Sequence, residues 1–255
     1  MIVNSQDVWN GALQGAVSLT YDDGHGSQLE RAAPLMEERE LRGTFYLNAG
    51  GPDWREWLQP WKALADRGHE IGNHTLSHTC SRNFSADTGA KGLERSTLDE
   101  IEADVLECER RLQEVIPVAA AARSFAYPCY QTDVGAGATR QSYVPVIARH
   151  FIAGRGIGEY GFANTPLNCD LHCLWSHSAE HCRGTELIGL VRKAVKYGRW
   201  LIFAFHSIDG GRLGIAEGEY AELLDYLTDE REHIWTAPVA EVAGYVLEAR
   251  EKWGV

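Results

Sequence analysis

The segment that decides the fold is AVSLTYDDG (residues 16–24), in which an apolar run ends directly in two aspartates and a glycine. Such a run, closed by residues that favour turns, is typical of a buried strand followed by a tight turn. About fifty residues later, the segment HEIGNHTLSH (residues 69–78) repeats this arrangement with two histidines. The chain therefore places two carboxylates and two imidazoles just after two expected strands.

These four side chains form a donor set with a recognisable chemistry. Asp22 and Asp23 are adjacent, and His74 and His78 are four residues apart. One carboxylate and two imidazoles can hold one divalent metal ion and leave a coordination position open for water. The remaining carboxylate can take a proton from that water, which predicts a hydrolase. Asp-Asp-Gly alone also fits an ordinary strand-ending turn, but the paired histidines favour the metal site.

The composition is that of an ordinary globular domain. The chain has 255 residues, of which 44% are hydrophobic and 24% charged, so we expect one domain over residues 1–255. A net charge of −12 argues against nucleic acid or an anionic membrane as a partner. No apolar run has membrane-spanning length, and the first fifteen residues lack a signal-peptide pattern. We therefore expect a cytoplasmic protein with free thiols at its six cysteines; the sequence does not indicate its oligomeric state.

Apolar strands and helix-period segments alternate along the chain. Continuous apolar strands separated by helices indicate a parallel sheet covered on both faces, so we expect an α/β fold, a closed or nearly closed, and in the latter case incomplete, (β/α) barrel of about seven strands. The long central helix is expected to begin with Ser96 or Thr97 as its N-cap. The expected strands are residues 16–21, 44–47, 69–72, 124–127, 151–153, 200–205 and 234–236, and the expected helices are residues 28–39, 58–67, 97–115, 185–195, 220–227 and 238–250.

Polar side chains follow several of these strands. The carboxyl ends of the strands in such a barrel meet at one rim, and active sites gather there. His206 directly follows the apolar strand 200–205, and residues 127–129 end another strand. We therefore expect these groups to meet the Asp and His pairs at one rim.

The motifs resemble those of the NodB-homology polysaccharide deacetylases, also called carbohydrate esterase family four. TYDDG (residues 20–24) is similar to the family's T-F-D-D-G motif, and HTLSH (residues 74–78) to its H-[ST]-x-x-H motif. The resemblance is weaker for FAYPCY (residues 125–130) with the third motif and for IFAFH (residues 202–206) with the late L-x-x-H motif. The resemblance runs from about residue 15 to residue 245.

This resemblance implies a fold and a set of roles. It implies the distorted β/α barrel of the family, one divalent metal ion, expected to be zinc, and an acetylated carbohydrate as substrate. Cys129, through its backbone N–H, and Tyr130 are expected to contact the reacting group. The implied metal ligands are Asp23, His74 and His78, the implied base is Asp22, and the implied acid is His206.

Two departures from the family pattern affect the base and the acid. Many members carry an arginine where this chain has Ala126, and in those members the arginine pairs with the base. We expect Arg155, which follows the expected strand 151–153, to supply that positive charge from another position on the rim. The aspartate that supports the acidic histidine in the family is not clear here, and Asp170 is the candidate.

Two clusters have more than one interpretation. Residues 169–182 (CDLHCLWSHSAEHC) are rich in cysteine and histidine, which allows a second, structural zinc site or a disulfide; we favour an active-site loop that turns Trp175 toward the substrate. Trp54, Trp57 and Trp61 are equally consistent with sugar stacking and with core packing.

The predicted function is the metal-dependent hydrolysis of acetyl groups from a polysaccharide or oligosaccharide, with N-acetyl favoured over O-acetyl. A first alternative is a metal-dependent amidase that acts on a small non-sugar amide. A second is a carbohydrate-binding relative without catalytic activity. An interaction scaffold has no positive support in the sequence.

Overall fold

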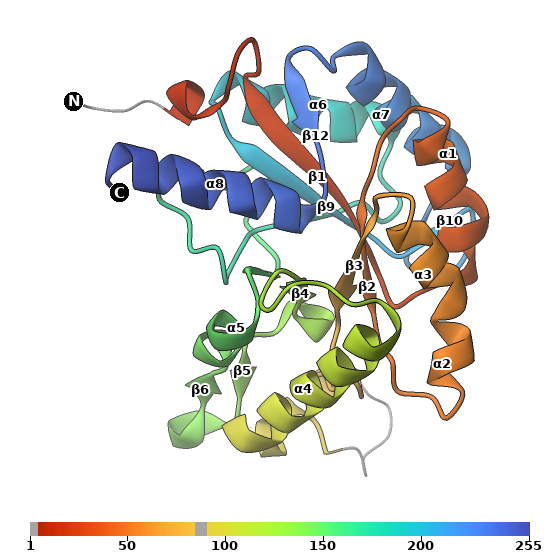
Figure 1. Cartoon of the computed structure of the whole chain (residues 1–255), viewed down its shortest axis with the longest axis vertical. Helices are drawn as coiled ribbons and strands as arrows, with labels where there is room; N and C mark the ends of the chain where they lie inside the picture. Colours follow the sequence, from red (N-terminus) through yellow and green to blue (C-terminus); the bar gives the residue numbers. More distant parts are fainter. Residues whose placement is uncertain (1–4, 85–90) are drawn as a thin grey trace.

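The computed structural model describes residues 5–84 and 91–255 of the chain, and its centre is a parallel β-sheet (Figure 1). The sheet has eight strands, of which β12 (Ile234–Thr236) lies off the main path and pairs with the first residues of β1. The fold is therefore the expected α/β architecture, a sheet curled into an incomplete barrel. The main path runs β7 (Ala153–Arg155), β4 (Ser124–Ala126), β3 (Glu70–Asn73), β2 (Thr44–Leu47), β1 (Gly15–Asp22), β9 (Trp200–Phe205) and β8 (His177–Ser178).

One irregular segment, residues 171–176, bridges the gap between the two ends of this path. The N–H of Leu174 donates to the carbonyl of Gly154 in β7 at 2.8 Å, and the N–H of Gly156 donates to the carbonyl of Leu174 at 2.9 Å. The same segment continues directly into β8, which pairs with β9. Hydrogen bonds to this loop thus connect β7 with β8, while the regular sheet itself remains open.

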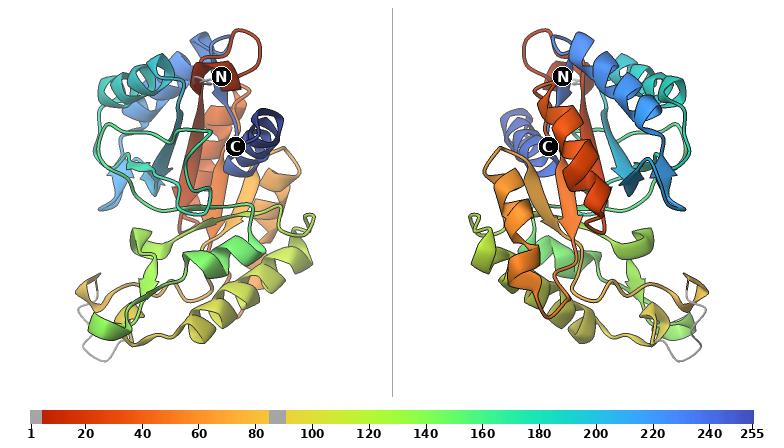
Figure 2. Two further views of the ribbon diagram at one scale, coloured as in Figure 1. Left: turned by 90° about the vertical axis from the view of Figure 1, so that its left-hand side faces the viewer. Right: turned by 90° about the vertical axis from the view of Figure 1, so that its right-hand side faces the viewer.

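Helices surround the sheet (Figure 1), and α1 to α3 lie beside one another in the right-hand view of Figure 2. Across the described residues, no helix combines the length and the apolar character that crossing a bilayer requires. The helices are α1 (Ala33–Glu37), α2 (Trp54–Trp57), α3 (Gln59–Ala65), α4 (Leu98–Val115), α5 (Val144–His150), α6 (Gly184–Lys196), α7 (Glu217–Asp229) and α8 (Val239–Trp253).

The longest helix, α4, begins at the predicted cap. The side chain of Thr97 accepts a hydrogen bond from the N–H of Glu100, and Glu100 returns one to the N–H of Thr97. This capping box satisfies backbone donors that would otherwise lack partners at the start of the helix. It fixes the start of α4, which packs against β3 and carries residues that hold the functional site.

Several elements differ from the sequence expectations. The predicted strand 151–153 is wrong at its start, because the N–H of Phe151 bonds to the carbonyl of Ile147 and ends α5, so that β7 begins at Ala153. The predicted helix 58–67 is observed as the shorter α3, and Leu58 separates it from α2, which was not predicted. Helix α5 and strand β8 were not predicted, since both are too short to show a clear period.

The tryptophans after β2 divide between core and surface. Trp54 and Trp61 are buried at 6% and 1% exposure and belong to the main hydrophobic cluster. Trp57 is 37% exposed, and its ring lies where a Cβ on Gly24 would clash at 2.8 Å. Core packing therefore accounts for two of the three, and Trp57 covers the turn that follows β1.

Candidate active site

The carboxyl ends of the strands bring the predicted residues to one rim. Asp22 is aligned with Tyr46 in β2, Ala126 with Arg155 in β7, and the end of β1 with the end of β9. A cavity of about 710 Å³ opens at this rim. Its walls include all five predicted catalytic and metal-binding residues, namely Asp22, Asp23, His74, His78 and His206.

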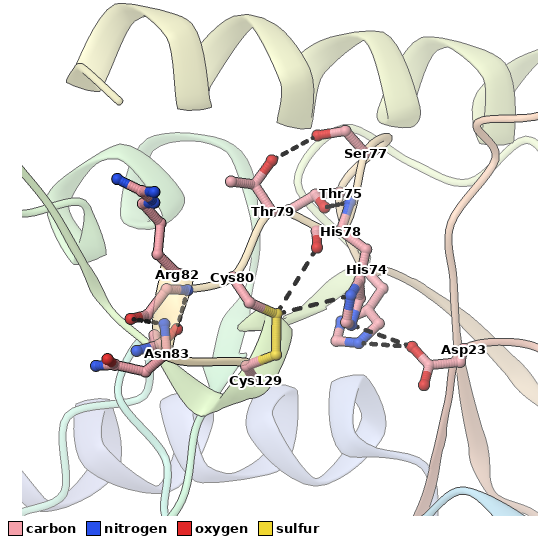
Figure 3. The surroundings of a disulfide bond; sticks show 12 residues. Asp23, His74, Thr75, Ser77, His78, Thr79, Cys80, Arg82, Asn83 and Cys129 are labelled. Carbon is pink, nitrogen blue, oxygen red and sulfur yellow. Dashed lines mark hydrogen bonds and ion pairs between the residues drawn. A yellow bond between two sulfur atoms is a disulfide. The ribbon is translucent and has the colours of Figure 1, made fainter. Parts of the chain in front are cut away.

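Three of these side chains converge on one point (Figure 3). Oδ1 of Asp23 lies 3.2 Å from Nε2 of His78 and 3.5 Å from Nε2 of His74. The three donor atoms lie within 4.8 Å of one another. One carboxylate oxygen and two imidazole nitrogens at this spacing fit a divalent cation with an open coordination position.

The backbone at the site adopts conformations that most residues avoid. Among the described residues, nine non-glycine residues have positive φ, and five of them belong to this site. Such conformations cost about 1–3 kcal/mol each and persist where the surroundings enforce them. These conformations therefore lower the stability of the fold at residues of the cavity wall and of the turn between the two histidines. The five are Asp23 (φ 71°), Thr75 (φ 63°), His78 (φ 49°), Cys129 (φ 51°) and Tyr130 (φ 59°).

The two histidines are held by different means. Nδ1 of His74 lies 2.8 Å from the carbonyl oxygen of Ala126, which fixes the ring with Nε2 toward Asp23. This is the outer contact that metal-binding histidines usually have. The turn to His78 is held from α4, because Asp104 accepts the N–H groups of Leu76 at 2.9 Å and Ser77 at 3.2 Å. Sequence reasoning missed Asp104, whose role depends on the packing of α4.

The charges in the donor set support one another. Burial alone would raise the pKa of Asp23, but hydrogen bonds from His74 and His78 and the attraction of their rings hold it well below its ordinary value. Burial alone would lower the pKa of His78, but the Asp23 carboxylate raises it. Asp23 is thus a carboxylate at neutral pH, as a metal ligand requires.

Asp22 makes a different contact from its neighbour. It is buried at 2% exposure, and its Oδ1 accepts a hydrogen bond from Nη2 of Arg155, which is fully buried. The guanidinium of Arg155 also lies 4.9 Å from the centre of the Tyr46 ring. Burial alone would lower the pKa of Arg155, but the Asp22 carboxylate raises it. β7 thus supplies a positive charge beside Asp22, while β4 has Ala126 at the position of the family's arginine.

Gln28 joins the two implied catalytic residues through their backbones. Its buried amide group donates to the carbonyl of Asp22 at 2.6 Å and to the carbonyl of His206 at 2.7 Å. The carboxyl ends of β1 and β9 are therefore tied to the helical turn that follows β1. The position of Gln28 in the sequence does not indicate this contact.

His206 faces the donor set on one side and an unpredicted carboxylate on the other. Its Nε2 lies 3.9 Å from Oδ2 of Asp23, and its Nδ1 lies 3.5 Å from Oε1 of Glu180. The second distance suits an ion pair and is too long for a good hydrogen bond. Asp170, the sequence candidate for this role, is wrong: it accepts the N–H of His172 at 2.8 Å. Glu180 follows the two-residue strand β8, which the sequence did not reveal.

The free thiol predicted at Cys129 is wrong. Cys129 forms a disulfide with Cys80, two residues after His78 (Figure 3). Both cysteines are half-buried and line the cavity. The contact between the backbone N–H of Cys129 and the reacting group remains a prediction. The other four cysteines of the chain are free.

Tyr130 also lines the cavity, and its hydroxyl group is buried without a hydrogen-bond partner among the described residues. Burial and the nearby Asp22 raise its pKa, so the phenol keeps its proton. An unpaired buried donor beside a cavity is available to a substrate oxygen.

The cysteine- and histidine-rich loop contributes less than expected. Trp175 is 40% exposed and is not among the residues that line the cavity. Of the residues the structure describes, the groups spaced for a metal ion do not include Cys169, Cys173 or Cys182. Ring nitrogens of His177 and His181 instead contact the carbonyls of Phe162 and Arg212. The loop's contribution to the cavity wall is Glu180.

Comparison with known proteins places the chain in a family. Residues 11–143, just over half of the chain, match the family described as Polysaccharide deacetylase. The chain belongs to the polysaccharide deacetylase family, as the motif resemblance predicted.

Two curated relatives match over shorter segments. A chitin deacetylase from Arthroderma benhamiae is 28% identical over 99 residues, which cover 38% of this chain and 26% of that protein. A chitin disaccharide deacetylase from Vibrio alginolyticus is 28% identical over 87 residues, which cover 31% of this chain and 20% of that protein. The matches thus span about a quarter or less of the relatives' length.

Solved structures share the fold over nearly the whole chain. The peptidoglycan deacetylase PdaC from Bacillus subtilis matches with a TM-score of 0.54 and 15% identity, over 96% of each chain. BA3943 from Bacillus anthracis, a CE4 family pseudoenzyme, matches with a TM-score of 0.55 and 16% identity, over 92% of this chain and 66% of that one. At these identities the likeness supports the fold alone.

Proposed function

We propose that this chain is a metal-dependent deacetylase that removes acetyl groups from a polysaccharide or oligosaccharide, with N-acetyl favoured over O-acetyl. The observation that carries the proposal is the convergence of Asp23, His74 and His78 on one point, with Asp22 and His206 in the same cavity. Family membership and the chitin-directed names of the two curated relatives support the carbohydrate substrate.

Each residue then has one task. Asp23, His74 and His78 would hold the cation, which when bound polarises an acetyl carbonyl and makes a water more acidic. Asp22 accepts the proton of the attacking water as general base, and Arg155 orients its carboxylate through a hydrogen bond. We expect the backbone N–H of Cys129 and the hydroxyl of Tyr130, two residues of the cavity wall, to contact the developing oxyanion.

His206 donates a proton to the leaving group. Its Nε2 faces the donor set, and Oε1 of Glu180 lies 3.5 Å from its Nδ1 on the other side of the ring. An amide nitrogen must be protonated to leave, whereas an ester oxygen needs this help far less. N-acetyl groups are therefore the substrate for which this arrangement is suited.

The direct test of the proposal is acetate release from a panel of N- and O-acetylated glycans, with and without a chelator. We expect release from N-acetylated oligosaccharides, its loss on chelation, and its return when Zn²⁺ is added back. Turnover confined to small non-sugar amides would instead support the amidase. Glycan binding without turnover in the presence of added Zn²⁺ would support a non-catalytic relative.

His206→Ala is expected to slow amide hydrolysis by about a hundredfold while acetyl esters lose less than about tenfold. The reason is the different need of the two leaving groups for a proton. The measurement is kcat/KM on matched N- and O-acetylated sugars. His233→Ala is the control, because His233 is an exposed histidine paired with Glu230. Equal losses on both substrates would argue against His206 as the acid.

A further inference from the structure

The disulfide beside the donor set carries an inference beyond deacetylation. Cys80 and Cys129 both line the cavity, so a soluble reductant and a metal ion can reach them. Their sulfurs and a ring nitrogen of His78 form a second group of donor atoms within 4.8 Å of one another. His78 thus belongs to two sets, since Nε2 faces Asp23 while Nδ1 faces Cys80 (Figure 3).

The surroundings of Nδ1 set His78 apart from His74. The ring of His74 has the usual outer contact, a carbonyl oxygen at 2.8 Å. Among the described residues, the polar side-chain atom beside Nδ1 of His78 is Sγ of Cys80, at 3.7 Å. A histidine that binds a metal normally places an oxygen at this position. His78 instead presents its second nitrogen to sulfur.

The spacing suits a tetrahedral cation. Bonds of about 2.0 Å to nitrogen and 2.3 Å to sulfur at a tetrahedral angle place the two ligand atoms about 3.5 Å apart. The 3.7 Å between His78 and Cys80 is close to this separation. The ring and the sulfur therefore lie at the spacing of two ligands on one ion.

Reduction would leave the two cysteines side by side, because other contacts join their segments. The N–H of Ser81 donates to Oε1 of Gln131 at 2.6 Å. The carbonyl of Cys80 accepts the N–H of Leu93 at 3.1 Å, and the carbonyl of Leu93 accepts the N–H of Gly135 at 2.8 Å. The 80–84 segment and the turn at Cys129 are thus held together independently of the sulfur–sulfur bond.

We propose that reduction of the Cys80–Cys129 disulfide creates a second metal site, formed by both thiolates and Nδ1 of His78, for a soft divalent cation such as Zn²⁺ or Co²⁺. A dithiol reductant supplies two electrons and two protons, becoming a disulfide itself as the two protein thiols form. The cation then displaces the two thiol protons and, when the first site is also filled, the ring proton of His78, whose imidazolate bridges the two ions. This site is redox-dependent and shares one ligand with the first site, but it does not depend on the proposed deacetylation.

The test is titration of the full chain with Co²⁺, before and after reduction by a dithiol that is removed under nitrogen. We expect the oxidised chain to bind Co²⁺ without thiolate-to-cobalt absorption. The reduced chain is expected to bind one Co²⁺ more and to show that absorption. The double variant Cys80→Ser/Cys129→Ser, which keeps the four free cysteines, is expected to lack both changes after the same treatment.

Each result bears on a separate claim. Reduced protein with two new titratable thiols but no thiolate-to-cobalt absorption would overturn the second site, as would equal absorption in the double variant. Alkylation of Cys80 and Cys129 before any reduction would overturn the redox dependence. Loss of the first, sulfur-free Co²⁺ site in both oxidation states would count against the proposed function and leave the second site standing.

Discussion

Asp22→Asn is expected to lower kcat for deacetylation by about 10³- to 10⁴-fold, the upper part of the range for losing a general base. The amide is close in shape to the carboxylate and keeps an oxygen that Arg155 can reach, but it cannot accept the proton of the attacking water. KM should change little, because the proposed role of Asp22 is proton transfer and not substrate binding. Steady-state kinetics on an N-acetylated oligosaccharide measures both values.

Asp23→Asn separates the two neighbouring carboxylates. Asp23 is the one that lies against both imidazoles, so its loss should weaken metal binding as well as turnover. Asp22 contacts Arg155 instead, so Asp22→Asn should still bind one metal ion per chain. Calorimetric titration with Zn²⁺ distinguishes the variants, and loss of metal binding in Asp22→Asn would make Asp22 a ligand.

Asp66→Asn is a matched control on the surface. Asp66 is exposed and paired with Lys62 within one turn of helix, a contact worth little to stability or to the site. Its activity should equal that of the unmodified chain. Because Asp22→Asn also weakens a buried ion pair, rates should be compared well below the unfolding temperature of each variant.

The strand ends were predictable because they depend on local sequence. Apolar runs marked the main strands, and a parallel sheet brings their carboxyl ends together whatever the loops do. The positions of Asp22, Asp23 and His206 follow from that rule, and His74 follows β3 in the same way. Arg155 was found for the same reason, although β7 starts later than expected.

The partners of these residues were harder to find. Glu180 reaches His206 because a two-residue strand pairs with β9, and two residues carry no periodic signal. Six cysteines allow many pairings, so sequence alone could not join Cys80 to Cys129. Gln28 acts through its side-chain amide on two carbonyls that are distant in sequence. Such contacts depend on packing between elements, which local patterns do not record.

The position of the buried arginine has a direct consequence for stability. Arg155 has no exposed surface, and its charge is balanced by Asp22, itself 2% exposed. Two of its nitrogens, Nε and Nη1, lack hydrogen-bond partners among the described residues. The Asp22 carboxylate and the faces of Tyr46 and Tyr130 are therefore its main stabilising contacts.

Arg155→Met is expected to lower the free energy of unfolding by about 3–5 kcal/mol, because it leaves the Asp22 carboxylate buried without a counterion. This loss is a large part of the 5–15 kcal/mol that typical domains have. Urea denaturation followed by circular dichroism measures it. Arg110→Met is the control, since Arg110 makes exposed ion pairs with Glu107 and Glu114 and should change stability by less than about 1 kcal/mol.

The double variant Asp22→Asn/Arg155→Met decides whether charge is the cause. Removing both charges leaves neither one uncompensated, so it should be more stable than Arg155→Met by about 2 kcal/mol. It should remain inactive, because the base is still absent. If the double variant is no more stable than Arg155→Met, the loss comes from the packing of Arg155 against Tyr46 and Tyr130. The positive charge of Arg155 would then orient the base and contribute little to the free energy of unfolding.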